Sequence, residues 1–399
     1  MSSVTPVFLN HAGAICSLGA DLASVEDNLF PSEQLTPGSE GNFLTLSDAW
    51  SPGRTLPLGL VTGHLPSTVI AAENTRNNRL LAASLSPLYG VVEGLKSRHG
   101  RHRIGIVVGT STSGIAEGEA ALTCDSAGAR LVPGYRYTSQ ELSAPTRFLA
   151  RCLDVSGPCW TQSSACTSGA KALASAARLL RLGVCDAVVA AGVDSLCHMT
   201  VAGFSSLLVT AESHCNPFSR NRCGINIGEA SAVFVLSREP GPVRLAGVGE
   251  SSDAYHISSP DPEGKGAAAA MLQALSMAQT DPAQIDYVNL HGTATPQNDA
   301  MEALAVNRVF GPDVPCGSTK PLTGHTLAAA GAIEALVCWL LLQRDDNRLP
   351  PHLWDGEVDP DLAALNGLAR SNGVAPARMV MSNSFAFGGN NLSLVLSRE

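Results

Sequence analysis

Short apolar runs rich in β-branched residues recur along the 399-residue chain, and glycine or charged residues bound each of them. Runs of this length and composition are typical of buried strands. The expected strands are residues 104–109, 186–194, 231–236, 243–248, 285–290, 377–382 and 392–397.

Two longer stretches, residues 167–182 and 325–343, are rich in alanine and leucine, and both predict helices. The longest apolar stretch, Leu327 to Leu342, contains Glu334 and has 16 residues, fewer than a membrane-crossing segment needs. We therefore expect a buried helix there and no membrane span. The alternation of strands and helices predicts an α/β fold.

Pro240, Gly241 and Pro242 interrupt the strand pattern, and this break predicts an N-terminal unit of residues 1–239 and a C-terminal unit of residues 240–399. Each unit places a polar cluster just before an alanine-rich helix, which suggests a duplication. Because small side chains allow close packing, we expect the two helices at the centre, with their N-terminal ends meeting. Helix N-termini expose unpaired N–H groups that stabilise thiolates and oxyanions.

Composition narrows the function classes. Hydrophobic residues make up 45% of the chain and charged residues 15%, as in globular proteins. The net charge of −9 would repel a phosphate backbone, so nucleic acid is not an expected partner. The N-terminus has no signal-peptide pattern, and eleven cysteines without a CxxC pair favour reduced thiols. We therefore expect a cytoplasmic location.

Cys166, in SACTSGAK, directly precedes the first alanine-rich helix. A thiol at a helix N-terminus has a lowered pKa and becomes nucleophilic, although most intracellular cysteines are small buried hydrophobes. His291, in VNLHGTATPQND, and His325, in STKPLTGHT, lie at element ends beside glycine, where loops carry active sites. For either histidine alone, a structural, hydrogen-bonded role would be favoured.

Other arrangements fit poorly. The GTSTS run at 109–113 lacks the final glycine of a serine nucleophile elbow, and Gly247-Val-Gly249 lacks the third glycine of a dinucleotide fingerprint. The cysteines and histidines between residues 197 and 223 match no common zinc spacing, so no metal site is expected.

Four motifs together resemble the elongating β-ketoacyl-acyl-carrier-protein synthases of the thiolase superfamily. They are SACTSG around Cys166, HGTATPQND from His291, STKPLTGHT around His325, and NSFAFGGNN at 383–391. They occur in the family's order. The resemblance implies a thiolase-like duplicated fold of five layers, α/β/α/β/α, with two sheets.

The same resemblance implies an acyltransferase that performs a decarboxylative Claisen condensation. Cys166 would take the acyl chain from acyl carrier protein as a thioester. His291 and His325 would assist the decarboxylation of malonyl carrier protein by stabilising the enolate through N–H groups. The N–H groups of Cys166 and Phe387 would form the oxyanion hole. No cofactor is implied, because phosphopantetheine on the carrier protein holds the substrates.

Further residues match supporting positions of the family. Lys320 and Glu334 would hold the charge arrangement of the active site. Asp299 and Glu302 match an acidic pair, for which helix capping and surface charge are the alternatives. The residues that would contact substrate are Thr293 and Thr295 on the pantetheine arm, Phe387 as an aromatic gate, Phe385 beside it, and Phe204 in the acyl tunnel.

The gate motif departs from the family. Elongating synthases commonly read GFGG followed by T-N, whereas this chain has Ala386 and Asn390. A β-carbon at residue 386 restricts a backbone that glycine would leave free. For residues 199–208, which could line the tunnel, core packing is an equal alternative.

Segments 74–84, 109–119, 215–230 and 250–264 resemble condensing enzymes of bacterial aryl-polyene pigment clusters. This points to polyketide-like synthesis of an aryl-primed chain. The alternatives are a housekeeping fatty-acid elongation synthase and a chain-length-determining partner subunit, which would lack the nucleophile. A thiolase would carry a second catalytic cysteine near Phe385, and a priming synthase would carry Asn in place of His325.

The resemblance also implies partners. We expect acyl carrier protein, and either a homodimer or a heterodimer with a subunit resembling a chain-length factor. Because carrier proteins are acidic, Arg76, Arg79 and the cluster at 98–103 are candidate docking residues.

Overall fold

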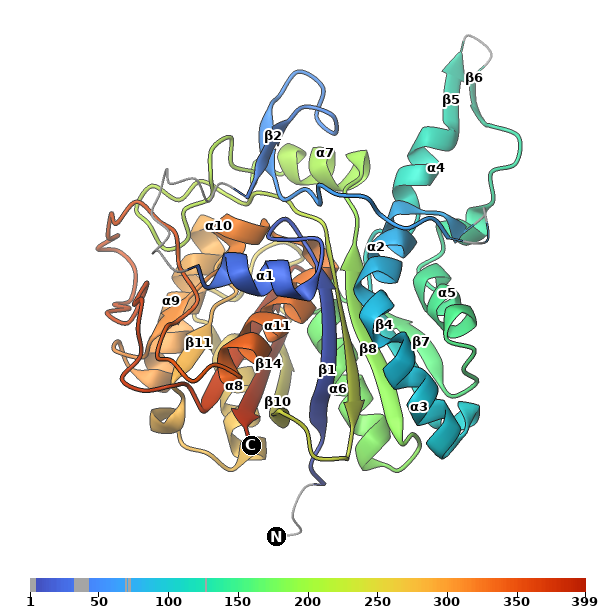
Figure 1. Ribbon diagram of the computed structural model, residues 1–399. Coiled ribbons are helices and arrows are strands. Elements are labelled where there is room, and N and C mark those ends of the chain that lie inside the picture. Colours follow the sequence, from blue (N-terminus) through green and yellow to red (C-terminus); the bar gives the residue numbers. More distant parts are fainter. Residues whose placement is uncertain (1–4, 32–42, 69, 71–72, 126–127) are drawn as a thin grey trace.

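The computed structural model describes residues 5–31, 43–68, 70, 73–125 and 128–399. Its framework is a mixed sheet of ten strands in the order β12-β11-β13-β14-β10-β1-β9-β8-β4-β7 (Figure 1). The strands of the first half are β1 (Phe8–Ile15), β4 (Ile104–Gly109), β7 (Cys159–Gln162), β8 (Ala187–Asp194) and β9 (Ala230–Ser237). Those of the second half are β10 (Val243–Ser252), β11 (Tyr287–Asn289), β12 (Cys316–Gly317), β13 (Met379–Ala386) and β14 (Asn390–Arg398).

Both halves have the same strand order. From the outer edge inward, each runs third, second, fourth, fifth and first strand of its own half. The halves meet where β1 and β10 pair antiparallel, at Phe8 with Arg244 and Leu9 with Val243. The predicted duplication is therefore confirmed, but hydrogen bonds join the two expected sheets into one. The predicted dividing line at residue 240 falls in the connection between β9 and β10.

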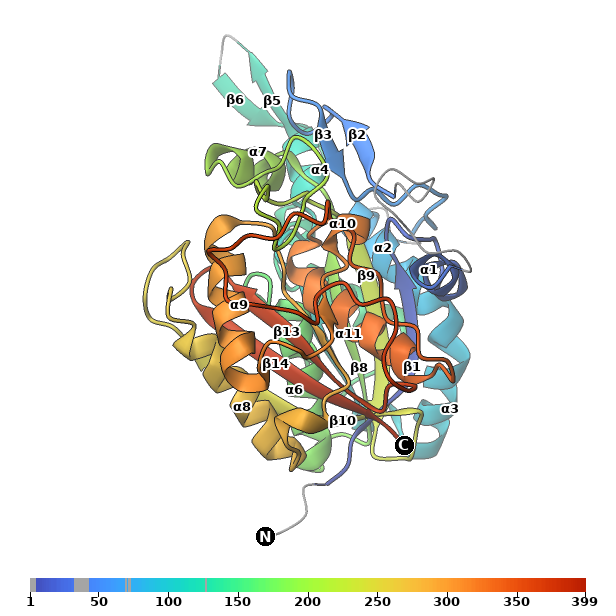
Figure 2. The same cartoon turned by 90° about the vertical axis from the view of Figure 1, so that its left-hand side faces the viewer.

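The helices complete the five expected layers. The central layer holds α6 (Ser168–Arg181) and α11 (Ala330–Leu342), which contact each other and strands of both halves. One outer layer holds α2 (Arg76–Leu85), α3 (Tyr89–His99) and α5 (Ala144–Cys152). The other holds α8 (Lys265–Ala278) and α9 (Pro296–Phe310), which cover β13 and β14 in Figure 2. The thiolase-like α/β fold is thus confirmed.

Small residues let the central helices touch. A β-carbon added to Gly169 of α6 would lie 2.8 Å from the backbone nitrogen of Ala332, and one added to Gly331 of α11 would lie 2.8 Å from the β-carbon of Ala170. The backbones therefore cross at a distance that larger side chains would prevent. Residues 327–342 are all buried, as predicted, but they begin with the 3-10 turn η6 (Leu327–Ala329) before α11.

The remaining elements are short. They are α1 (Leu22–Leu29), α4 (Ile115–Ala121), α7 (His198–Ser206), α10 (Lys320–Thr323), the hairpin β2 (Thr45–Ser47) with β3 (Leu56–Leu58), the hairpin β5 (Leu122–Asp125) with β6 (Gly128–Leu131), and the 3-10 turns η2 (Ser86–Leu88), η3 (Arg101–Arg103), η4 (Tyr137–Ser139) and η5 (Pro282–Gln284). The arm formed by α4, β5 and β6 projects from the first half in Figure 1. Among the helices of the described residues, none is long and apolar enough to cross a membrane.

Candidate active site

Cys166 lies at the junction between β7 and α6. The preceding residue, Ala165, has a φ of +51°, a left-handed backbone conformation that residues other than glycine rarely adopt. The Ser168 hydroxyl donates to Ala165 O (2.6 Å) and accepts the N–H of Ser164 (2.8 Å), which holds this turn. The turn brings Cys166 to the N-terminal end of α6, where it lines a pocket and is only 7% exposed.

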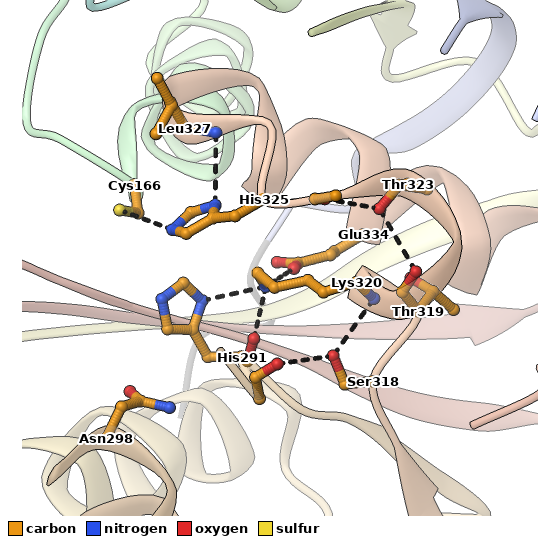
Figure 3. Close-up of polar contacts among 12 residues, drawn as sticks. Cys166, His291, Asn298, Ser318, Thr319, Lys320, Thr323, His325, Leu327 and Glu334 are labelled. Atoms are coloured by element: carbon orange, nitrogen blue, oxygen red, sulfur yellow. Dashed lines mark hydrogen bonds and ion pairs between the residues drawn. The ribbon is translucent and has the colours of Figure 1, made fainter. Parts of the chain in front are cut away.

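His325 occupies the equivalent place in the second half, between the third strand, β12, and the central helix, α11. Its Nδ1 accepts the N–H of Leu327 at 3.3 Å, so the ring proton lies on Nε2. Nε2 lies 3.1 Å from Sγ of Cys166, and Figure 3 shows the two side chains pointing toward each other. His325 therefore presents an N–H group to the sulfur.

His291 completes the group from the loop after β11. Its ring centroid lies 5.3 Å from that of His325, with the ring planes at 86°. Lys320 Nζ lies 3.4 Å from His291 Nδ1, and it also donates to the backbone oxygen of His291 and to Glu334 (Figure 3). An ammonium group only donates, so Nδ1 of His291 accepts and its ring proton also lies on Nε2.

Burial sets the protonation states of Cys166, His291 and His325. It lowers the pKa of His291 and His325 well below the usual value, and Lys320 lowers both further, so the rings are neutral near pH 7. Burial also raises the pKa of the Cys166 thiol to about 12, although Lys320 opposes the shift. The expectation that the helix N-terminus lowers this pKa is therefore wrong, because desolvation of the thiolate outweighs it.

Cys166, His291 and His325 present ligand atoms within 4.8 Å of one another, a spacing that a metal ion could use. Metal coordination through Nε2 requires a bare lone pair on that nitrogen. Here Leu327 and Lys320 donate to the opposite nitrogens, which keeps the proton on Nε2. We therefore interpret the trio as a hydrogen-bonding site.

Two buried carboxylates of α9 hold the loop that carries His291. Glu302 accepts the N–H groups of His291 and Gly292, each at 2.7 Å. Asp299 accepts the N–H of Ala294 in the same loop at 3.2 Å, and also that of Phe218 at 2.7 Å. Burial raises the pKa of Asp299 to about 6 and that of Glu302 to about 8, and the N–H donors oppose these shifts. Surface charge does not describe this pair, since neither residue is exposed.

The other expected substrate residues line the same pocket. The hydroxyls of Thr293 and Thr295 lie 2.9 Å apart, and the Phe385 ring lies 6.2 Å from the His291 ring. The N–H of Phe387 donates toward the Cys166 sulfur, and the Phe387 ring lies 5.9 Å from the ring of Phe204 on α7. One pocket thus collects all the residues expected to contact substrate.

Asp194, at the end of β8, was not among the residues expected at the site. Its carboxylate is fully buried and accepts hydrogen bonds from Thr110, Ser111 and Thr112 after β4 and from Ala328 in η6. The only signal in the sequence is an acidic residue that ends an apolar strand.

The candidate docking arginines already have partners within the chain. The Arg76 guanidinium pairs with buried Glu229, and Arg79 donates to the backbone oxygens of Leu65 and Pro66. In the cluster at 98–103, every arginine pairs with a carboxylate. That cluster precedes β4, whereas the site lies beyond the carboxyl end of β4. These side chains therefore do not form a free basic rim at the pocket.

Comparisons with known proteins agree with this geometry. Residues 92–240 match the β-ketoacyl synthase N-terminal domain, and residues 243–353 match the β-ketoacyl synthase C-terminal domain. The chain is 32% identical over 317 residues to 3-oxoacyl-[acyl-carrier-protein] synthase 2 of Rhizobium meliloti (strain 1021), a match that covers 74% of each chain.

Two solved structures extend the likeness to the whole chain. The ketosynthase ApeO, in complex with its chain length factor ApeC, from Xenorhabdus doucetiae is 43% identical, with a TM-score of 0.90 over 99% of this chain and 98% of that one. A β-ketoacyl synthase from Burkholderia phymatum STM815 is 27% identical, with a TM-score of 0.84 over 99% of this chain and 100% of that one. The chain therefore belongs to the β-ketoacyl synthase family and is a condensing acyltransferase of the 3-oxoacyl-[acyl-carrier-protein] synthase type.

Proposed function

We propose that this chain is the catalytic ketosynthase subunit of an aryl-polyene pathway, with Cys166 as its nucleophile and His291 and His325 as its hydrogen-bond donors. The observation that carries the site assignment is the 3.1 Å contact between Cys166 Sγ and His325 Nε2, next to the ring of His291. The pathway assignment rests on the resemblance of four segments to aryl-polyene condensing enzymes, and the 43% identity to ApeO supports it.

In the first half-reaction, the sulfur of Cys166 attacks the thioester carbonyl of an acyl carrier protein. A C–S bond to Cys166 forms, and the bond to the phosphopantetheine sulfur breaks, so the carrier leaves as its thiol. The N–H groups of Cys166 and Phe387 hold the oxyanion between these steps, and the N–H of Phe387 already points toward the sulfur.

In the second half-reaction, malonyl carrier protein loses CO₂. The electron pair of the broken C–C bond becomes an enolate on the thioester oxygen, and the two Nε2–H groups stabilise its charge. Neutral imidazoles suit this role, because they donate without readily giving a proton to carbon. The carbanion then attacks acyl-Cys166, which releases the thiolate and gives a 3-oxoacyl product.

We further propose a heterodimer with a subunit that resembles a chain-length factor. β7 is the last strand of the sheet, and among the described residues it pairs with β4 alone, so one backbone edge is open. Leu131 (53% exposed), Tyr137 (67%) and Leu142 (42%) leave apolar surface on the adjoining excursion between β4 and β7. ApeO crystallised with such a partner. The ten cysteines whose side chains the structure describes are all unpaired, which favours a reducing, cytoplasmic location.

The test is intact-mass detection of an acyl adduct on the wild type and on Cys166→Ala. Acyl carrier protein would carry either a saturated medium-length chain or an aryl-polyene starter, with and without the partner subunit. We expect an adduct on the wild type only, and mainly from the aryl starter. An adduct mainly from the saturated chain would return the protein to fatty-acid elongation. An adduct on Cys166→Ala, or none on any sample, would overturn the site assignment.

A further inference from the structure

The turn that carries Phe387 has little of its own to hold it in place. It joins β13 to β14, and its next two residues, Gly388 and Gly389, have φ of +84° and +73°. Glycine adopts these left-handed backbone angles without strain, but it adds no side chain that could pack against the rest of the protein. The turn has one backbone hydrogen bond of its own, from Gly389 N–H to Ala386 O at 3.0 Å. The position of the Phe387 N–H therefore depends also on contacts from outside the turn.

Two of these contacts lead to the segment that follows β10. Gly388 N–H donates to Ile257 O at 2.8 Å, and Asp253 N–H donates to Gly389 O at 2.8 Å. Both fix the turn against residues 253–257, and Ile257 is 80% exposed. Neither contact relates the turn to the helix that carries the nucleophile.

A third contact connects the turn to the helix that carries Cys166. Lys171 lies on α6, five residues after Cys166, and its Nζ donates to Asn390 Oδ1 at 2.9 Å. Asn390 lies three residues after Phe387. One hydrogen bond therefore joins the helix that positions the sulfur to the turn that positions the N–H group.

The partial burial of Lys171 costs desolvation free energy. Lys171 is half-buried, its pKa is lowered chiefly by desolvation, and within the described part of the chain no carboxylate oxygen lies within ion-pair distance of it. A neighbouring positive charge, Arg178, lowers the pKa further. An apolar side chain at this position would avoid the desolvation cost, so a role other than stability is the better explanation.

We propose that Lys171 is a positioning residue that, through Asn390, keeps the Phe387 N–H aimed at the oxyanion formed on acyl transfer to Cys166. This rests on the proposed function of that cysteine. An oxyanion donor contributes about 10²- to 10³-fold in rate when it is removed outright. Here the donor stays but its position loosens, and we therefore expect a loss of about tenfold.

The experiment follows the acylation of Cys166 by acyl carrier protein loaded with the aryl-polyene starter, with a rapid acid quench and intact mass. The variants are Lys171→Met, Asn390→Leu, the double variant, Lys171→Arg and the control Lys96→Met, which removes a distant lysine of α3. Acylation should slow about tenfold in each single loss variant. The double variant should be no slower, because the two residues act as one unit. Lys171→Arg should recover most of the rate, and Lys96→Met should match the wild type.

A second reaction separates positioning from general damage. Iodoacetamide alkylates the Cys166 thiolate by displacement at carbon and forms no oxyanion. Because the Phe387 N–H also lowers the pKa of the Cys166 thiol, alkylation should slow in Lys171→Met, but far less than the tenfold expected for acylation. Equal acylation rates in these two proteins would overturn the proposal, and so would an equal loss of both reactions in the variant. If the wild type takes no acyl group from the carrier, the proposed function fails instead.

Discussion

Asp194 accepts the backbone N–H of Ala328 through Oδ2 at 2.8 Å, so a carboxylate at the end of β8 holds the turn that begins the central helix of the other half. Its Oδ1 accepts the N–H groups of Ser111 and Thr112 after β4. Ala328 is next to Leu327, whose N–H sets the tautomer of His325. One buried side chain thus joins three segments directly behind the site.

We expect Asp194→Asn to lower the free energy of unfolding by about 3 kcal/mol, because the amide NH₂ must face one of these donors and leave it unsatisfied. Urea denaturation checks this value. Asp186→Asn, at the other end of β8, is the matched control, and it should cost only about 1 kcal/mol because Asp186 pairs with arginines near the surface. Equal losses for the two variants would contradict the role given to Asp194.

Lys320→Met should lower the free energy of unfolding by about 3–5 kcal/mol, because it leaves the buried carboxyl of Glu334 without its partner. The double variant Lys320→Met with Glu334→Leu should recover most of that stability. It should not recover the release of CO₂ from malonyl carrier protein, since Nδ1 of His291 still lacks its contact with Lys320. Recovery of both properties would mean that Lys320 serves stability alone.

The pH dependence of thiol alkylation tests the effect of burial on Cys166. With its pKa raised to about 12, the thiolate is the minor form at pH 7. Its fraction, and hence the rate of iodoacetamide alkylation, should rise about tenfold per pH unit between pH 7 and 10. Peptide mapping distinguishes Cys166 from the exposed Cys152, Cys159 and Cys223. A plateau below pH 8 would mean that the helix N-terminus and the N–H donors outweigh burial.

Gly249→Ala tests how closely α8 packs on β10. An added β-carbon would lie 1.9 Å from the backbone oxygen of Ala270, so backbone must move, and we expect a loss of at least about 3 kcal/mol in unfolding free energy. Gly90→Ala is the control, because it lies in helix α3 with open space around it and should stabilise by about 0.5–1 kcal/mol. A neutral Gly249→Ala would contradict the packing described.

The sequence was informative wherever the chemistry coincides with the end of an element. Cys166, His291 and His325 could be singled out because each follows a strand or precedes a helix, next to glycine. The order of the strands and the tautomers of the histidines could not be predicted from the sequence, because they depend on contacts between distant residues. Asp194 illustrates the limit, since its donors come from segments 82 to 134 residues away.

Two failures have the same physical origin. β1 contains Asn10, His11 and Gly13, so its pattern is weak, and it becomes a strand because β9 and β10 pair with it on both sides. Arg76 looked like a free surface cation, but its partner, Glu229, lies 153 residues further along the chain. In each case, tertiary context overrides the local pattern.

The packing of the two central helices has a consequence for how such a protein can evolve. Packing between α6 and α11 depends on alanine and glycine, whereas Cys166 and His325 stand at the two helix starts and add mainly hydrogen bonds. A duplicated gene could therefore lose the thiol in one copy without losing its framework. That copy would keep a pocket of nearly the same shape but could not hold an acyl chain covalently. Its pocket could then serve to set the length of the product chain.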